Sequence, residues 1–569
     1  MASDHVSGPA DRILTGGWIW TGRPEDGPPR EGWAVALKGD RIQAVGPRAQ
    51  VASLKGPGTA VLELEGRFLM PGFVDAHVHL QAGGLDLFRV DLRGVDSPEE
   101  LVRRVADRAH STPKGEWILG GGWDEHLWGG ELPHRGWLDR VVPEHPVLLL
   151  RTDLHVGVAN SLALERAGID GETPDPERGR IDREGAGGHG TPGLPTGILR
   201  ESALDPLAQR IPPPSPADRE GALRAAALHA LSRGVTQVHD MGAIQSPEES
   251  WASLAILRGL HASGRLPLRV VAAVPIAHRR RMQELIEDEG RGDARLRWGL
   301  VKGFVDGSLG AGTAWFHEPY AHDPTSAGGP ITDLGELRTG IFEAVEAGLQ
   351  PAVHAIGDRA VDWLLKVYAE VAEGRPKADL RLRVEHAQHM TPEGIRMADA
   401  PHVALSVQPA HLADDGGWAE ARIGARRIAG AFAYGTLHRA GARLALGSDW
   451  TVAPLDPRCA LAAAVAREVH AASMPGFSPG TRTFGSPDEC LSLSEAMTAH
   501  TLGGAWAGGM ETETGTIEVG KRGDLVVLSQ SPFQLYPHEF VTELHAEMTF
   551  VDGALVWATE DPSGGGFAP

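Results

Sequence analysis

Two histidines in the segment Asp75-Ala76-His77-Val78-His79 have the spacing of a metal site. In a β-strand, alternate side chains share a face with Cα atoms about 6.6–6.8 Å apart, so two imidazoles can converge on one ion. In a helix, the same spacing turns the side chains about 200° apart. The pattern therefore predicts metal binding only if MPGFVDAHVHL is a strand, as its composition indicates. The alternative is two core or surface histidines that bind no metal.

Three later residues repeat this placement at the ends of apolar runs. His354 ends the run AVH, His386 ends LRVEH, and Asp449 ends LALGSD. A single histidine at a strand end is usually a structural residue. Four histidines and one aspartate in the same position are hard to explain by packing, and they favour a shared metal centre.

Lys302, in LVKGFVDG, is the unusual member of this set. A lysine within a buried strand is costly, because burial disfavours its charge. One interpretation is an ion pair with a nearby carboxylate such as Asp306. The other is a lysine carbamate, an anionic ligand that would bridge two metal ions about 3.5–4 Å apart.

The elements that must position these residues recur along the middle of the chain. Eight apolar, strand-like runs are followed by segments of helical composition, such as LRTGIFEAVEAGL. Eight β-α units predict an α/β fold, a (β/α)8 TIM-type barrel whose active site lies at the carboxyl ends of the strands. The runs are FLMPGFVDAHVHL, GVTQVHDMG, LRVVAAV, GLVKGFVDG, LQPAVHAIG, LRVEHAQ, HVALSVQP and ARLALGSDW.

Both ends of the chain alternate polar and apolar residues around Gly and Asp turns, as in AVLELEGRFLM and EMTFVDGALVW. We predict a small composite β-sandwich domain from residues 10–69 and 508–560, and a metal-dependent barrel from residues 70–507. The gap between His79 and the second run is too long for one crossover. We predict an insertion after the first barrel strand, at about residues 84–230, that covers the barrel mouth and shapes the substrate pocket.

The composition excludes several classes of protein. The net charge of −21 disfavours nucleic acid and anionic membrane partners. Two cysteines, Cys459 and Cys490, exclude a disulfide framework and a cysteine-rich zinc site. The chain has no signal-like start and no run of about 18 apolar residues, so we expect a cytoplasmic protein with a small-molecule substrate. A homodimer is the commonest assembly for such a chain.

The chain resembles the amidohydrolase superfamily, and within it the YtcJ-like branch that includes N-substituted formamide deformylases. The motifs that carry the resemblance occur in the family's order from about residue 13 to residue 557, nearly the whole chain. They are highly specific for the superfamily and fairly specific for the branch. They are MPGFVDAHVHL, GGWDEHLW, VKGFVDGSLG, VHAIGDRA, RVEHAQ, SVQPAHL, LALGSDWTVAPLDP and GTIEVGKRGDLVVL.

The resemblance implies a metal-dependent hydrolase that cleaves a non-peptide C–N bond, of amide or formamide type, with a metal-bound hydroxide. It implies two divalent ions, with zinc as the preferred metal, that are bridged by a carboxylated Lys302. Asp449 would take the proton of the bridging water and return it to the leaving amine. The more buried ion would lie on the HxH pair and Asp449, and the second on the two later histidines. The implied ligands are His77, His79, Lys302, His354, His386 and Asp449.

Five further residues are predicted to contact the substrate. Trp123 and Asp124 in GGWDEHLW, and His155, lie in the insertion, where the alternative is a packed Trp with capping polar groups. Gln408 and His411 follow the seventh run. His239-Asp240 ends the second run, and we expect a structural use for it.

One departure from the branch concerns the loop after VDGSLG. The branch often reads Ser-Arg-Thr-Ala there, whereas this chain has Ala311-Gly312-Thr313-Ala314. An arginine that could meet a substrate anion is therefore missing, which makes acidic substrates less expected.

Other functions remain as alternatives. Deaminases on the same barrel usually use one metal and lack the bridging lysine, so Lys302 argues against them. Lactone or ester hydrolysis would suit the same centre. A non-catalytic scaffold would typically have lost ligands, whereas all six positions are filled here. The chain has no GxSxG elbow, and AIGDRA lacks the repeated glycines of a dinucleotide loop. The His and carboxylate set suits zinc, iron, manganese or cobalt.

Overall fold

The computed structural model describes residues 8–151, 155–184, 193–243, 246–375, 379–469 and 482–559. The chain forms two compact units. Of the described residues, the first comprises those up to 84, those from 223 to 469 and those from 482 onward, and the second comprises those from 85 to 222.

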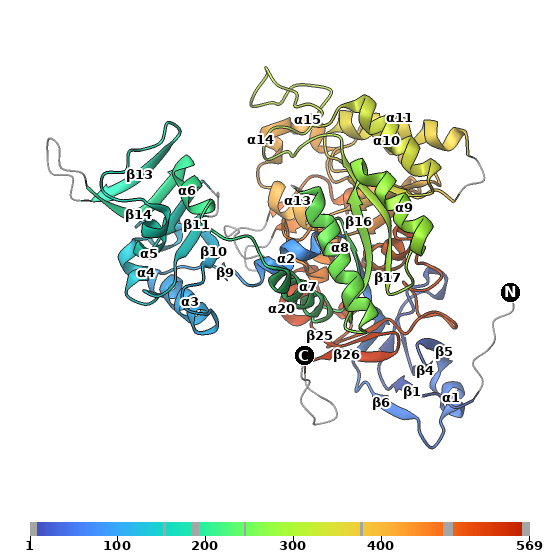
Figure 1. Cartoon of the computed structure of the whole chain (residues 1–569). Coiled ribbons are helices and arrows are strands. Elements are labelled where there is room, and N and C mark those ends of the chain that lie inside the picture. Colours follow the sequence, from blue (N-terminus) through green and yellow to red (C-terminus); the bar gives the residue numbers. More distant parts are fainter. Residues whose placement is uncertain are drawn as a thin grey trace. The chain divides into compact units, whose positions relative to one another are not determined.

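The first unit contains a barrel of eight parallel strands that follow one another in chain order. Two of them, β16 and β17, are labelled in Figure 1. Val78, at the end of β8, bridges in parallel to Trp450, just beyond β21, and so links the first strand to the segment after the last. The eight apolar runs in the sequence all lie in these strands, which confirms the predicted (β/α)8 barrel. The strands are β8 (Phe73–Val78), β15 (Val235–Asp240), β16 (Arg269–Pro275), β17 (Leu296–Phe304), β18 (Gln350–Ala355), β19 (Leu382–His386), β20 (Val403–Val407) and β21 (Arg443–Leu446).

Helices follow the barrel strands and cover them. In α11, Val361, Leu364, Leu365 and Tyr368 have the i, i+3, i+4, i+7 spacing of one helical face, and all four are buried in the main core. Local signals set the starts: the Ser246 side chain accepts a hydrogen bond from the Glu249 amide at the start of α8. These helices are α8 (Pro247–Ala262), α9 (Arg279–Glu289), α10 (Leu334–Glu346), α11 (Asp358–Glu373), α12 (Pro392–Ala398) and α16 (Tyr434–Arg439).

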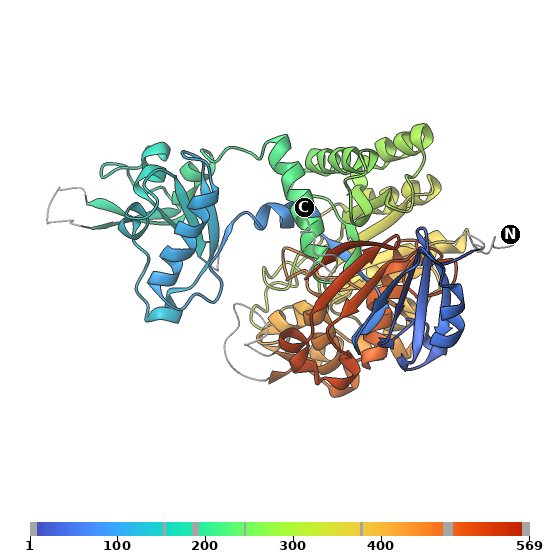
Figure 2. The ribbon, with the colours of Figure 1, turned by 90° about the horizontal axis from the view of Figure 1, so that it is seen from below.

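The two ends of the chain form the predicted β-sandwich. One sheet has the order β5-β4-β1-β6 and the other β26-β25-β24-β7-β2-β3. β7 pairs antiparallel with β24, with Met70 opposite Val526, so amino- and carboxyl-terminal strands lie side by side (Figure 2). Leu14 and Leu525 share one core. The strands are β1 (Arg12–Thr15), β2 (Trp18–Ile19), β3 (Arg30–Glu31), β4 (Trp33–Lys38), β5 (Arg41–Pro47), β6 (Ala60–Glu63), β7 (Phe68–Pro71), β24 (Leu525–Leu528), β25 (Ala546–Val551) and β26 (Ala554–Ala558).

The second unit is the insertion that follows the first barrel strand. Its sheet has the order β13-β14-β12-β11-β10-β9, and α3 (Pro98–Ser111) packs Leu101 and Val105 into a core of its own. The covering role of this unit at the barrel mouth stays a prediction. Its strands are β9 (Val90–Asp91), β10 (Ile118–Trp123), β11 (Val147–Arg151), β12 (Val156–Ala159), β13 (Gly179–Glu184) and β14 (Leu194–Glu201).

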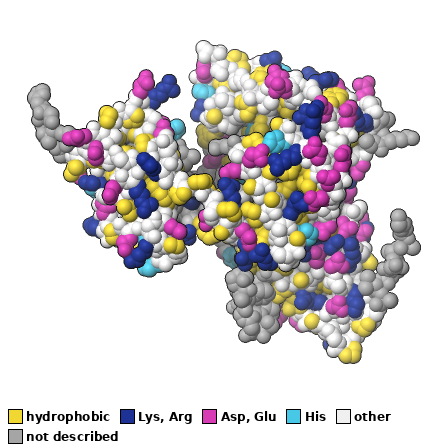
Figure 3. All heavy atoms as spheres, viewed as in Figure 1, with side chains coloured by type: hydrophobic (Ala, Val, Ile, Leu, Met, Phe, Trp, Pro, Cys, Tyr) yellow, Lys and Arg dark blue, Asp and Glu magenta, His cyan; other side chains and the backbone are white. Residues whose placement is uncertain are grey.

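The surface of the protein carries charges of both signs. Acidic and basic side chains are interspersed on the face seen in Figure 3. Within the described parts of the chain, no helix is both long and apolar enough to cross a membrane.

Candidate metal centre

The first barrel strand presents alternating polar side chains. Asp75, His77 and His79 are all buried in β8 or directly after it. Asp75 is not aimed at an ion: its Oδ1 accepts backbone hydrogen bonds from His77 (3.2 Å) and Ser448 (2.9 Å). Burial raises the pKa of Asp75 to about 7, although these amide hydrogen bonds oppose the rise. This carboxyl group therefore fastens the first strand to the segment after the last.

The two histidines of the HxH motif are oriented by hydrogen bonds at Nδ1. His77 Nδ1 lies 2.7 Å from Glu385 Oε2, and His79 Nδ1 lies 2.6 Å from the Gly242 carbonyl oxygen. Each Nδ1–H donates to its acceptor, which leaves each Nε2 as a lone-pair donor. Both Nε2 atoms lie 3.4 Å from the same oxygen, Oδ1 of Asp449. The strand thus delivers two nitrogen ligands to one point, as the spacing predicts.

Two more histidines lie near the carboxyl ends of β18 and β19, the fifth and sixth strands of the barrel. His386 donates from Nδ1 to Gln408 Oε1 at 2.8 Å, and its ring centroid lies 5.0 Å from that of His77. His354 places Nε2 3.0 Å from the Gly307 carbonyl oxygen, and its ring centroid lies 4.4 Å from that of His386. Burial, with Lys302 nearby, lowers the pKa of His354 to about 3. The ring is neutral at ordinary pH, which is the state that binds metals.

Lys302 lies in the same cluster. Its side chain is buried on β17, with Nζ 3.4 Å from His77 Nε2. Burial lowers the pKa of Lys302 to about 8, despite the nearby carboxylates of Glu385 and Asp449. Among the described residues, Lys302 has no ion pair with Asp306, so that interpretation is wrong. Asp306 instead accepts backbone hydrogen bonds, including those of Ile356 (3.0 Å) and Trp315 (2.8 Å).

Asp449 follows β21 with a left-handed backbone, at φ 56°. Its Oδ2 lies 3.6 Å from His411 Nε2, and its buried Oδ1 accepts no hydrogen bond within the described residues. Burial alone would raise the pKa of Asp449, but the surrounding histidines hold it well below its usual range. The result is a buried anion with an open coordination position.

These residues fit a divalent metal ion. Ligand atoms of His77, His386 and Asp449 all lie within 4.8 Å of one another. Oδ1 of Asp449 accepts no hydrogen bond from the part of the chain that the structure describes, whereas a buried carboxylate oxygen needs a partner, and a cation would supply it. His386 and Asp449 both have positive φ angles, 75° and 56°, a strain that concentrates at functional sites. Imidazole and carboxylate ligands suit zinc, iron, manganese and cobalt.

A buried charged pair beneath the centre was missed by the sequence reasoning. Glu385 and Arg383 alternate on β19, are both completely buried, and are joined by a 2.8 Å hydrogen bond from Nε to Oε1. Arg383 Nη1 also donates to His239 Nδ1 at 2.8 Å. The sequence did contain a signal for this pair: two charged residues in an otherwise apolar strand. Buried charges require partners, so such residues are expected to pair with each other or with neighbours. His239 thus has the structural use that we expected.

The remaining predicted residues are placed as follows. Gln408 holds His386, and His411 lies beside Asp449. In the insertion, Trp123 is fully buried and its indole donates to the Leu149 carbonyl oxygen, which is a packing role. Asp124 accepts from the His126 amide at the start of a 3-10 turn. His155 is exposed and pairs with Glu201 at 3.0 Å.

Comparison with known proteins adds relatives that cover most of the chain. Protein LONG AFTER FAR-RED 3 of Arabidopsis thaliana is 35% identical over 96% of this chain and 92% of its own length. The putative amidohydrolase YtcJ of Bacillus subtilis is 32% identical over 96% of this chain and 99% of its own. N-substituted formamide deformylase of Arthrobacter pascens is 30% identical over 92% and 94%.

A solved structure has the same architecture. An uncharacterized metal-dependent hydrolase from Pyrococcus furiosus superposes with a TM-score of 0.70 and is 31% identical, covering 92% of this chain and 99% of its own. The model of the amidohydrolase family Amidohydro_3 matches residues 60–557. The chain therefore belongs to the amidohydrolase family and has the fold of its metal-dependent hydrolases.

Proposed function

We propose that the chain hydrolyses a non-peptide C–N bond, of amide or formamide type, at this centre. The observation that carries the proposal is Asp449, a buried carboxylate whose Oδ1 lies 3.4 Å from Nε2 of both His77 and His79 and accepts no hydrogen bond among the described residues. The choice of bond is supported by the relative from Arthrobacter pascens, which is named for the deformylation of N-substituted formamides.

The ligand set divides between two ions in this proposal. His77, His79 and Asp449 would hold the more buried one, and His354 and His386 the other. Zinc is the first choice for such a set. When bound, a divalent ion acts as a Lewis acid. It polarises a carbonyl group and lowers the pKa of a coordinated water to about 7.

In this proposal Lys302, as a carbamate, would be a ligand shared by the two ions. Its buried amine reacts as the neutral form: the nitrogen adds to the carbon of carbon dioxide and loses one proton, which gives an anionic carbamate. The carbamate replaces a positive charge that burial disfavours with a negative charge that two cations stabilise.

Asp449 carries the protons. The histidines around it keep it ionised at neutral pH, so it can accept a proton from the attacking water while the water oxygen bonds to the carbonyl carbon. It then returns this proton to the nitrogen as the C–N bond breaks. One amide and one water give one carboxylic acid and one amine.

A combined metal analysis and substrate screen tests the proposal. Metal-replete protein is assayed with N-formyl and N-acyl amines, amino acid amides, lactones and aminopurines. We expect two metal equivalents per chain and release of formate or another acid together with an amine. One equivalent with ammonia release from an aminopurine would make the chain a deaminase. Metal-free, inactive protein would favour the scaffold alternative.

A further inference from the structure

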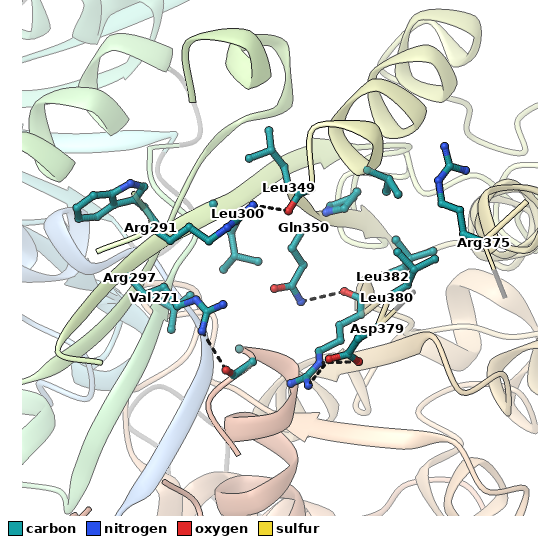
Figure 4. A pocket seen from close by; sticks show the side chains of 18 residues that line it. Val271, Arg291, Arg297, Leu300, Leu349, Gln350, Arg375, Asp379, Leu380 and Leu382 are labelled. Atoms are coloured by element: carbon teal, nitrogen blue, oxygen red, sulfur yellow. Dashed lines mark hydrogen bonds and ion pairs between the residues drawn. The ribbon is translucent and has the colours of Figure 1, made fainter. Parts of the chain in front are cut away.

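A cavity of about 420 Å³ opens at the amino-terminal ends of the barrel strands, away from the strand ends that carry the metal ligands. It is lined by residues at the starts of β17, β18 and β19, among them Arg297 and Gln350 (Figure 4). A second cavity of about 380 Å³ shares Arg291, Arg297 and Gly509 with it. Such volumes are those of small-molecule sites.

Four arginines line the first cavity, and they differ in their partners. Arg381 pairs with Glu511, at 2.6 Å from Nη2, and Arg375 lies 3.4 Å from Glu346. Arg291 and Arg297 form no ion pair with any described residue: they donate to the carbonyl oxygens of Gly348 (2.7 Å) and Gly509 (3.1 Å). The cavity therefore contains two guanidinium groups that form no ion pair with a described carboxylate, although the nearby Glu511 partly offsets the fall in the pKa of Arg297.

The positive charges of Arg291 and Arg297 are destabilised in this cavity when no anion is bound. Burial lowers the pKa of Arg291, and Arg297 adds to this effect. Burial also lowers the pKa of Arg297, with Arg381 as the next cause. An anion between them would remove the repulsion and accept the N–H groups that the two backbone contacts leave free.

The backbone leaves room for the guanidinium groups. A Cβ atom at Gly299, where φ is 124°, would lie 2.5 Å from Arg291 Nη1. A Cβ at Gly509 would lie 3.8 Å from Arg297 Nη1 and 3.7 Å from Arg381 Nη1, so Gly509 faces both side chains. Figure 4 shows Arg291 and Arg297 on one side of the cavity, with Arg375 and Asp379 across from them.

We propose that this cavity binds a small molecule bearing a phosphate group, held by Arg291 and Arg297. A phosphate monoester carries about 1.5–2 negative charges at neutral pH, which matches two unpaired arginines. A monocarboxylate would leave one of them uncompensated. The cavity is larger than a bare phosphate needs, so it has room for the organic part of an ester. The site is independent of the hydrolytic proposal, because none of its residues belongs to the metal centre.

Titration calorimetry of the full, metal-loaded chain tests this site with three probes: inorganic phosphate, glycerol 3-phosphate and acetate. We expect the two phosphates to bind and acetate to bind far more weakly. The double variant Arg291→Gln/Arg297→Gln should lose about tenfold or more in phosphate affinity, the scale of charge-assisted hydrogen bonds. Arg338→Gln, which removes an exposed arginine paired with Glu370, is the matched control and should bind as the wild type does.

Phosphate can also bind to the catalytic metals, but wild type and double variant carry the same metal centre, so their difference reports the arginine cavity alone. Unchanged phosphate affinity in a folded double variant would overturn the proposal, and so would acetate binding as tight as that of phosphate. Folding of the variant is checked independently by its thermal unfolding and its metal content.

Discussion

His77 Nδ1 lies 2.7 Å from Glu385 Oε2, and this hydrogen bond connects the first barrel strand to the sixth across the barrel interior. Glu385 is in turn held by Arg383, whose Nε lies 2.8 Å from Oε1. A carboxylate that accepts from Nδ1 fixes the ring and makes Nε2 a better metal ligand. Glu385 is therefore a positioning residue for the metal centre.

We expect Glu385→Gln to weaken metal binding by about 10–100-fold, because the neutral amide is a poorer acceptor for the His77 N–H. The variant also leaves the buried Arg383 charge without its carboxylate, which costs about 3–5 kcal/mol of unfolding free energy. Competition with a chelator measures the affinity, and urea unfolding measures the stability. Glu370→Gln, at an exposed ion pair, is the control. Wild-type metal affinity in Glu385→Gln would show that the hydrogen bond is not needed.

Asp449→Asn tests the proton carrier. Asparagine has the shape of aspartate but cannot accept the water proton, so we expect kcat to fall by about 10²–10⁴-fold or more while the far-ultraviolet circular dichroism stays unchanged. Metal content is measured on the same sample, because asparagine is a weaker metal ligand than aspartate and a loss of metal would also lower activity. The exposed Asp488→Asn should retain full activity. Near-normal turnover in Asp449→Asn would exclude its role as the base.

Lys302→Ala tests the bridging carbamate. Removal of the amine should lower the metal content from two equivalents to one or fewer, and activity should fall with it. Native mass spectrometry of the wild type should detect one added carbon dioxide per chain, which acid should release. An unmodified lysine in protein that holds two metals would contradict the bridge.

The barrel and the metal residues could be predicted because their signals are local. Each strand shows as an apolar run, and each candidate ligand lies within such a run or just after it, as His354 and Asp449 do respectively. The contacts made by Glu385 could not be predicted in this way. Its partner His77 lies more than 300 residues earlier in the chain, and only the closure of the barrel brings the two together.

Lys302 and Asp306 illustrate the same limit at short range. The two are four residues apart, which suggested an ion pair, but the strand ends between them at Phe304. Beyond it Asp306 accepts backbone amides of the chain that follows, including Gly357 at 2.8 Å. Sequence separation predicts a contact only while both residues stay in one regular element.

His500 makes stability depend on pH. Its ring is buried, Nδ1 lies 3.0 Å from the Val74 carbonyl oxygen, and burial lowers its pKa to about 4. The unfolded chain then binds more protons than the folded one between the ordinary pKa of about 6.5 and pH 4. The stabilising contribution is therefore complete above about pH 6.5 and is lost as pH falls toward 4. At pH 5 the loss is about 2 kcal/mol.

The variant His500→Asn removes this titration and keeps a donor in the position of Nδ1. We expect the difference in unfolding free energy between wild type and variant to shrink by about 2 kcal/mol from pH 7.5 to pH 5. Asp75 and Asp306, whose pKa values burial raises to about 7, act with the opposite sign, but they are present in both proteins and cancel. Thr501→Val, a buried change without a titrating group, should show the same difference at both pH values. A pH-independent difference for His500→Asn would contradict the assignment.

Arg269 joins the barrel to the β-sandwich. From β16 it forms two 2.8 Å hydrogen bonds to Asp524, just before β24, and a third to Asp552, just after β25. Arg269 and Asp524 are both buried. We expect Arg269→Met to lower the free energy of unfolding by about 3–5 kcal/mol, because it leaves the Asp524 carboxylate buried without its main partner.

The double variant Arg269→Met/Asp524→Asn should recover part of this loss, since the uncompensated charge is removed along with the arginine. Urea unfolding of the wild type, both single variants and the double variant forms a complete thermodynamic cycle. Arg338→Met, at a half-exposed ion pair, should change stability by less than about 1 kcal/mol. If Arg269→Met is as mild as this control, or if the double variant is no more stable than Arg269→Met, then burial of the Asp524 charge does not explain how the β-sandwich is held to the barrel.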